Sequence, residues 1–255
     1  MIIKTLLAGA LGAGSIASMV YYDYIKRGMF RRFHGIFTIA VPADLDLYRS
    51  LLRKPLEMPE RPIVGLFFIQ YFNTKPWPMG PYKEYTLALR CKHNDEVGWH
   101  VKTMPVDKFV PVNGWWLQGW PKYVADDISF EPSNGGWQGA VTHKGDNKVT
   151  MRFTPGVSRE LDPWEQEFLE SGAAQLNEPL YNWEPAPSGP VLLRVMLEQV
   201  MVPEWQSELG TTTITIGTSE PWAGLIPPGA QLVSLYQRYK GGAILVPKLK
   251  GIYRS

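Results

Sequence analysis

Apolar positions in this sequence fall into short runs and alternations that predict β-strands along most of the chain. A nearly continuous apolar run at residues 63–72 (IVGLFFIQYF) is typical of a strand buried on both faces. Further strands are predicted at 86–91, 99–104, 138–143, 148–153, 191–202 and 211–218, with a hairpin turn at 144–147. A turn at 227–229 then leads to a helix or strand through Tyr239, and a last segment at 243–246 ends the fold.

Two segments carry the start and stop signals of helices. Residues 42–52 begin with a proline, have acids in the first turn, and place Leu45, Tyr48 and Leu52 on one face. Residues 162–176 begin with an aspartate cap followed three positions later by a glutamate. No internal repeat or long linker divides the chain, so residues 26–255 are expected to form one strand-dominated domain, closed or nearly closed around a pocket.

The first 25 residues form a separate apolar segment. Residues 5–22 carry no charge and reach the length of a membrane span, but they are rich in glycine, alanine and serine. Three interpretations remain: a membrane anchor, a cleaved secretory signal, or a helix packed on its own domain or on a sister subunit. Basic residues at 26–32 would place an anchored domain in the cytosol, so the expected location is the cytoplasm or the cytosolic face of a membrane.

Composition narrows the classes of function. Lys and Arg total 26 against 24 Asp and Glu, a net charge of +2 that does not indicate a nucleic-acid partner. The single cysteine and four scattered histidines form no metal-ligand spacing, and no glycine-rich phosphate loop is present. We therefore expect no metal and no cofactor. The 10 Trp, 12 Tyr and 10 Phe predict an aromatic-lined interior that binds a small molecule.

Two residues are candidates for chemistry. Lys122 follows Trp120 and Pro121, and in dry aromatic surroundings burial would lower its pKa and yield a free amine that attacks a carbonyl. The alternative is a surface turn with the ammonium in water. Glu84 precedes the strand at 86–91, and at the mouth of an apolar pocket its carboxyl group could move protons. Its alternative is an ordinary loop carboxylate.

The segments that carry these residues occur in a recognisable order: FTIA at 37–40, ADLD at 43–46, KPLE at 54–57, PYKEY at 81–85, GWPKYVA at 119–125, AGLIP at 223–227 and AILVP at 243–247. Over residues 33–250 this order resembles the acetoacetate decarboxylase superfamily. The resemblance implies a closed or nearly closed antiparallel β-barrel around a central apolar pocket with a few flanking helices, and assembly as a homo-oligomer. It also implies Lys122 as the Schiff-base lysine and Glu84 as the active-site glutamate.

Two positions depart from the family pattern. The family's decarboxylases carry a second lysine directly after the nucleophile, where this chain has Tyr123. An arginine associated with the substrate carboxylate falls at His34. Without these two positive charges, an acidic β-keto acid is less favoured as the substrate. Tyr123 becomes a candidate proton donor or acceptor. We expect His34, Tyr82, Trp116 and Trp120 to bind the substrate.

The leading hypothesis is a lyase that forms a Schiff base through Lys122 on a carbonyl substrate. Decarboxylation of a β-keto acid, or a related aldol, dehydration or cyclisation reaction, would follow. The tryptophans favour a larger apolar compound of polyketide or terpenoid type, as in secondary metabolism. The alternative is a non-covalent apolar-ligand-binding protein that keeps the fold and uses Lys122 as an orienting cation.

Overall fold

The computed structural model describes residues 30–74, 81–108, 119–171, 179–184, 191–199, 204–240 and 245–254. The N-terminal segment 1–25, and with it the choice between anchor, signal and packed helix, lies outside the described residues. In the part of the chain that is described, no helix is long and apolar enough to cross a membrane.

Strands dominate the described residues and join in one 13-stranded sheet. They are β1 (Phe30–Ala40), β2 (Val64–Thr74), β3 (Tyr82–His93), β4 (Glu96–Val106), β5 (Lys122–Val124), β6 (Asp127–Ser133), β7 (Gly136–His143), β8 (Asp146–Pro155), β9 (Leu180–Glu184), β10 (Val191–Gln199), β11 (Glu204–Ile216), β12 (Gln231–Lys240) and β13 (Leu245–Arg254). Their order is β13-β10-β9-β4-β3-β2-β1-β12-β11-β8-β7-β6, with β5 beside β4. Neighbours run antiparallel, except that β5 and β9 run parallel to β4.

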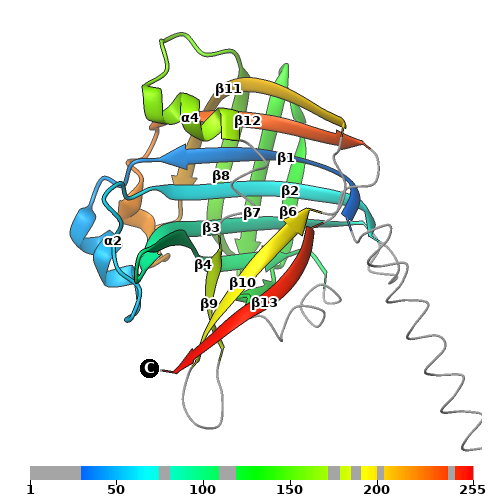
Figure 1. Ribbon diagram of the computed structural model, residues 1–255. Coiled ribbons are helices and arrows are strands. Elements are labelled where there is room, and N and C mark those ends of the chain that lie inside the picture. The colour runs from blue at the N-terminus through cyan, green and yellow to red at the C-terminus, as the bar shows by residue number, and fades with distance from the viewer. Residues whose placement is uncertain are drawn as a thin grey trace, which may run out of the picture.

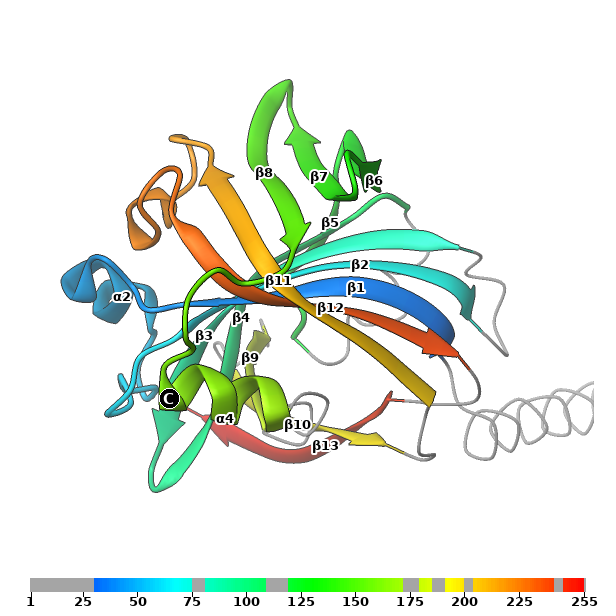
Figure 2. The ribbon, with the colours of Figure 1, turned by 90° about the horizontal axis from the view of Figure 1, so that it is seen from above.

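The β-dominated, antiparallel fold class expected from the sequence is confirmed. Among the described strands, hydrogen bonding ends at β13 and β6, so the sheet does not close into a continuous ring. Figures 1 and 2 show that it bends over instead. In Figure 2, β6, β7 and β8 lie on one side of β1 and β2, while β10 and β13 lie on the opposite side. The central strands are therefore covered on both faces, as the apolar run of β2 predicted.

Two apolar clusters fill the two sides of this central layer. On the first face, which we call the barrel face, Ile36, Phe68 and Leu87 pack with residues of β6–β8 such as Val141 and Met151. On the opposite face, which we call the reverse face, a smaller cluster is formed by buried residues of the β1–β4 region: Ile39, Ile63, Ala88, Trp99, Val101 and Met104. Leu180 of β9 packs on this cluster and also on the apolar residues of β10. A side chain's position in the strand alternation thus decides which of the two interiors it enters.

Both predicted helices are present, but the first begins later than predicted: Asp44 caps it, and Pro42 lies before the helix and not at its first position. In α2 (Leu45–Leu51) the Asp44 carboxylate accepts the backbone N–H groups of Asp46 and Leu47. In α4 (Pro163–Ser171) the Asp162 N–H donates to Glu165 Oε2 at 2.9 Å, the reciprocal contact of a capping box. A short 3₁₀ helix, η3 (Ala223–Leu225), follows β11. The predicted end of the second helix, at 172–176, lies outside the described residues.

Each predicted strand coincides with a strand of the structure, and most extend beyond their predicted limits. Of the predicted strand 191–202, residues 200–202 lie outside the described residues, and β11 ends at Ile216, two residues before the predicted limit of 218. The β7–β8 hairpin turns on Lys144 (φ 54°) and Gly145 (φ 77°), the left-handed pair that a two-residue hairpin loop requires. The segment after the turn at 227–229 is a strand, β12, so the open choice between helix and strand is settled. Residues 243–244 of the last predicted segment lie outside the described residues, and β13 begins at Leu245.

Gly98 of β4 lies against Pro179, the residue that precedes β9. The Trp99 N–H donates to the Pro179 carbonyl at 2.9 Å, and a Cβ added to Gly98 would lie 2.3 Å from that same oxygen. We expect Gly98→Ala to lower the free energy of unfolding by about 1–3 kcal/mol in urea titrations, because the backbone at Pro179 must move away. The control is Gly224→Ala, whose Cβ would meet only the flexible Leu47 Cδ2 at 3.1 Å. Equal effects of the two substitutions would contradict this account.

Candidate active site

The register of three strands brings Lys122 and Glu84 to the same face of the sheet. Glu84 of β3 is directly opposite Val106 of β4, and Lys122 of β5 is directly opposite Met104, two residues away on the same strand. Because side chains two residues apart share a face, both groups lie on the reverse face with Met104. The three-residue strand β5 thus carries Lys122 to the carboxyl group of Glu84.

The two side chains form a buried ion pair. Lys122 Nζ donates to Glu84 Oε2 at 2.5 Å, and the side chains are 5% and 6% exposed. The ammonium also lies 5.6 Å from the centre of the Tyr82 ring. Thr86, the next residue on this face of β3, donates its hydroxyl to Glu84 Oε1 at 3.5 Å. Both charged groups are therefore held in fixed positions out of bulk water.

Burial and the ion pair shift the pKa of Lys122 in opposite directions. Desolvation lowers the pKa of Lys122 below its ordinary value, because the charged form loses its hydration. The Glu84 carboxylate opposes this shift through its charge and its hydrogen bond. Desolvation is the larger effect, so the free amine is more accessible here than for a lysine in water.

A stacked tyrosine pair borders the ion pair. Tyr71 of β2 is directly opposite Tyr82 of β3, and their rings stack with centroids 4.7 Å apart. Burial, followed by the nearby Glu84 charge, raises the pKa of both phenols well above the usual value, so both stay protonated. The buried Tyr82 hydroxyl has no hydrogen-bond partner among the described residues. Tyr71 was not among the predicted site residues, although its place near the end of the apolar run at 63–72 is visible in the sequence.

Tyr123 lies on the opposite face from Lys122, because the two are consecutive residues of β5. Its phenol hydrogen-bonds Thr103, and its ring lies 4.7 Å from that of His143. Burial raises its pKa. The structure therefore places the Tyr123 hydroxyl away from the Lys122 amine, on the barrel side of the sheet.

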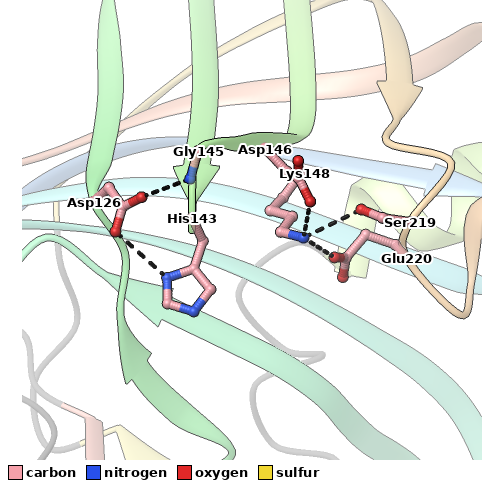
Figure 3. A network of polar contacts seen from close by, with 7 residues as sticks. All are labelled: Asp126, His143, Gly145, Asp146, Lys148, Ser219 and Glu220. Atoms are coloured by element: carbon pink, nitrogen blue, oxygen red, sulfur yellow. Dashed lines mark hydrogen bonds and ion pairs between the residues drawn. The ribbon is translucent and has the colours of Figure 1, made fainter.

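His143, which contacts the Tyr123 ring, belongs to a group of polar side chains shown in Figure 3. His143 Nδ1 lies 3.8 Å from Asp126 Oδ1, and Asp126 Oδ2 accepts the Gly145 N–H at 3.1 Å. Beside them, Lys148 contacts Asp146, Ser219 and Glu220 at 3.1–3.3 Å. These contacts join the β7–β8 hairpin to the segment that precedes η3.

His34 also lies on the barrel face. It is directly opposite Gln70 of β2. Glu84 is in register with the next residue of each strand, Ile69 of β2 and Gly35 of β1, whose positions face the other side of the sheet. The ring nitrogens of His34 lie 3.1 Å from Gln70 Oε1 and from the Tyr236 hydroxyl. Four aromatic rings surround it, from Phe72, Phe130, Trp137 and Tyr236. Burial lowers its pKa, so it is a neutral, hydrogen-bonded core histidine that does not share a face with Lys122.

Of the seven predicted site residues, the structure brings Lys122, Glu84 and Tyr82 together. Trp120 lies two residues before Lys122 and packs on the reverse-face cluster with Trp99 and Met104. Trp116 lies outside the described residues. Within the described part of the chain, no group of three or more His, Cys, Asp or Glu side chains could hold a metal ion.

The chain belongs to the acetoacetate decarboxylase family, whose model, described as "Acetoacetate decarboxylase (ADC)", matches residues 29–237. The matched region contains the ion pair and both tyrosines beside it. A search of curated proteins found no match.

Solved structures share this fold at low sequence identity. An acetoacetate decarboxylase from Legionella pneumophila is 18% identical with a TM-score of 0.66, and the match covers 88% of this chain and 87% of that one. The enduracididine biosynthesis enzyme MppR, solved in complex with pyruvate, is 19% identical with a TM-score of 0.57, covering 86% and 89%. An acetoacetate decarboxylase-like enzyme from Sphingomonas wittichii RW1 is 17% identical with a TM-score of 0.57, covering 86% and 92%. The chain thus has the fold of an enzyme family.

Proposed function

We propose that this protein is an enzyme that forms a Schiff base between Lys122 and the carbonyl group of a small organic substrate. The observation that carries the proposal is the buried Lys122–Glu84 pair, with an Nζ–Oε2 distance of 2.5 Å on a face lined by tyrosines. Burial lowers the pKa of Lys122 and so increases the fraction of neutral amine, which is the form of lysine that attacks a carbonyl carbon. Glu84 is then the group placed to move protons.

The chemical sequence follows from these two groups. The Lys122 ammonium passes a proton to Glu84, and the free amine attacks the substrate carbonyl carbon. The carbonyl oxygen then leaves as water, and a protonated imine remains. This iminium accepts an electron pair from the neighbouring carbon, either when carbon dioxide departs from a β-keto acid or when Glu84 takes a proton from that carbon. Protonation and hydrolysis of the resulting enamine, or its addition to a second carbonyl compound followed by hydrolysis, return the free lysine.

Tyr82 is the residue best placed to bind the substrate. Its buried hydroxyl is a hydrogen-bond donor without an acceptor among the described residues, which is costly unless a ligand supplies one. A substrate oxygen is a suitable acceptor. We assign the proton transfers to Glu84 and leave Tyr123 out of them, because its hydroxyl is on the barrel side of β5.

Both decarboxylation and carbon–carbon bond formation are consistent with this mechanism. Family membership supports the first. The second is supported by MppR, one structure of which is described as a complex with the condensation product of pyruvate and imidazole 4-carboxaldehyde. The described residues of β1 and β2 in register with Glu84 are Gly35 and Ile69, which carry no charge for a substrate carboxylate. This favours a substrate whose reacting end is a ketone or aldehyde in apolar surroundings.

The test is borohydride reduction of the purified protein with β-keto acids, pyruvate, and larger apolar ketones and aldehydes, followed by peptide mass mapping. We expect a reduced adduct on Lys122. Lys102→Met is the matched control, since burial also lowers the pKa of Lys102, and this variant should retain the adduct. Saturable ligand binding without any adduct would contradict the proposal and favour the non-covalent binding protein, in which Lys122 stays an ammonium paired with Glu84.

A further inference from the structure

A second group of basic side chains lies where the end of α2 meets β4 and β9. Lys102 of β4 donates its ammonium to the Leu51 carbonyl at 2.8 Å and lies 3.5 Å from His100 Nε2. His100 Nδ1 is 2.7 Å from the Tyr181 carbonyl, which fixes Nδ1 as the protonated nitrogen and leaves Nε2 as an acceptor. His100 is directly opposite Leu89, a barrel-face residue, so this group lies on the other side of the sheet from Lys122.

Arg53 adds a second positive charge to this group. It follows α2 in sequence, and its guanidinium lies over the Trp183 ring of β9 at 4.5 Å from the ring centre. Stacking on an aromatic ring holds the guanidinium in place while its N–H edge remains available. No hydrogen bond from this guanidinium to a described residue is found, and the residue is exposed.

The charges of Lys102 and Arg53 are not balanced within the described part of the chain. Neither residue forms an ion pair with a described carboxylate. A partly buried ammonium is ordinarily matched by an acid, whereas here two of its three N–H groups meet neutral acceptors. Consistent with this, the pKa of Lys102 is lowered by burial and by the Arg53 charge. The pKa of His100 is lowered to about 4 by burial and by the charges of Lys102 and Arg53.

We propose that Lys102 and Arg53 bind a small oxyanion, a carboxylate or a phosphate, at the junction of α2, β4 and β9. The remaining Lys102 N–H and the planar N–H edge of Arg53 supply the donors that such an anion requires. The ordering of Arg53 on Trp183 reduces the entropy lost on binding. The site is distinct from the imine-forming pair, so its ligand is an effector or a second anionic group, not the carbonyl that reacts with Lys122.

The experiment measures thermal unfolding of the full chain during titration with sodium phosphate, and separately with sodium acetate, at constant ionic strength kept with chloride. We expect saturable stabilisation of the wild type by at least one of the two anions, because a ligand of the folded state raises its stability by mass action. Lys102→Met and Arg53→Gln should each bind about tenfold more weakly. Lys144→Asn, which removes an exposed lysine in the β7–β8 turn, should bind as the wild type does.

A second measurement reports on the site itself and does not depend on unfolding. The chain has four histidines, so their side-chain ¹⁵N resonances can be followed individually. The anion should shift the His100 signals in the wild type and not in Arg53→Gln, whose substituted side chain is exposed and leaves the core intact. Equal stabilisation of all four proteins, or no saturable effect of either anion, would overturn the proposal. Borohydride trapping at Lys122 is read separately, so failure of one proposal does not carry over to the other.

Discussion

Lys122→Met is expected to abolish borohydride trapping and to lower the free energy of unfolding by about 3–5 kcal/mol. The activity loss follows from removing the only atom proposed to bond to the substrate. The stability loss has a different cause, since the Glu84 side chain, 6% exposed, is left as a buried carboxylate without its counter-ion. Urea titrations followed by circular dichroism measure the second effect, and peptide mapping measures the first.

The double variant Lys122→Met/Glu84→Gln separates these two effects. A neutral amide beside a methionine leaves no unpaired charge, so most of the lost stability should return while trapping stays absent. Arg49→Gln is the matched control, because it breaks an exposed ion pair with Asp46, of 2.6 Å, whose side chains are 58% and 94% exposed. That substitution should cost less than about 1 kcal/mol. Stability losses that simply add in the double variant would show that the two groups do not act as a buried pair.

Glu84→Gln is expected to shift the acid limb of the pH profile for imine trapping to lower pH. The Glu84 carboxylate raises the pKa of Lys122 through its charge and hydrogen bond, whereas burial lowers it. With the carboxylate gone, burial acts with less opposition, the pKa of Lys122 falls further, and the free amine persists at lower pH. The rate at the plateau should nevertheless fall by about 10²–10⁴-fold for any step that needs Glu84 as base.

The measurement is the initial rate of trapping from pH 5 to pH 10 with a single ketone, compared with full turnover of the same substrate. Asp95→Asn, which removes an exposed carboxylate from the β3–β4 turn, should leave the profile unchanged. A limb that stays in place in Glu84→Gln, or moves to higher pH, would mean that Glu84 does not control the charge of Lys122.

Much of the fold was predictable because its elements depend on local chemistry. The start of α4 could be predicted from a short pattern, because the Glu165 carboxylate accepts the backbone N–H of Asp162, three residues earlier. The start of α2 was predicted at Pro42, whereas Asp44 caps the helix by accepting the backbone N–H of Leu47. The apolar run of β2 required a strand covered on both sides, and the bent sheet provides this. The pairing of β1 with β12 joins residues about two hundred positions apart, and no local pattern indicates it.

In the candidate site, too, the sequence indicated single residues, whereas their contacts depend on the pairing of distant strands. Lys122 and Glu84 were singled out by the segments that carry them, and the structure brings the two into contact although 38 residues separate them. Tyr123 was expected to donate or accept a proton and His34 to bind the substrate, because both occupy positions that matter in the family pattern. Strand alternation and register put both on the barrel face, and a shift of one residue is enough to move a side chain to the other side of a sheet.

By itself, the sequence determined the family, the strand-dominated class, the presence of two helices and the two residues proposed for chemistry, because each depends on residue type and short-range order. Only the tertiary structure decided which of those residues meet. It paired the amine with the carboxylate, stacked Tyr71 on Tyr82, and placed Lys102 near Arg53 with no ion pair to a carboxylate of the described residues. The physical reason is that burial and counter-charges are set by strands distant in sequence, and these two quantities govern whether a lysine is a nucleophile, a cation or an anion-binding group.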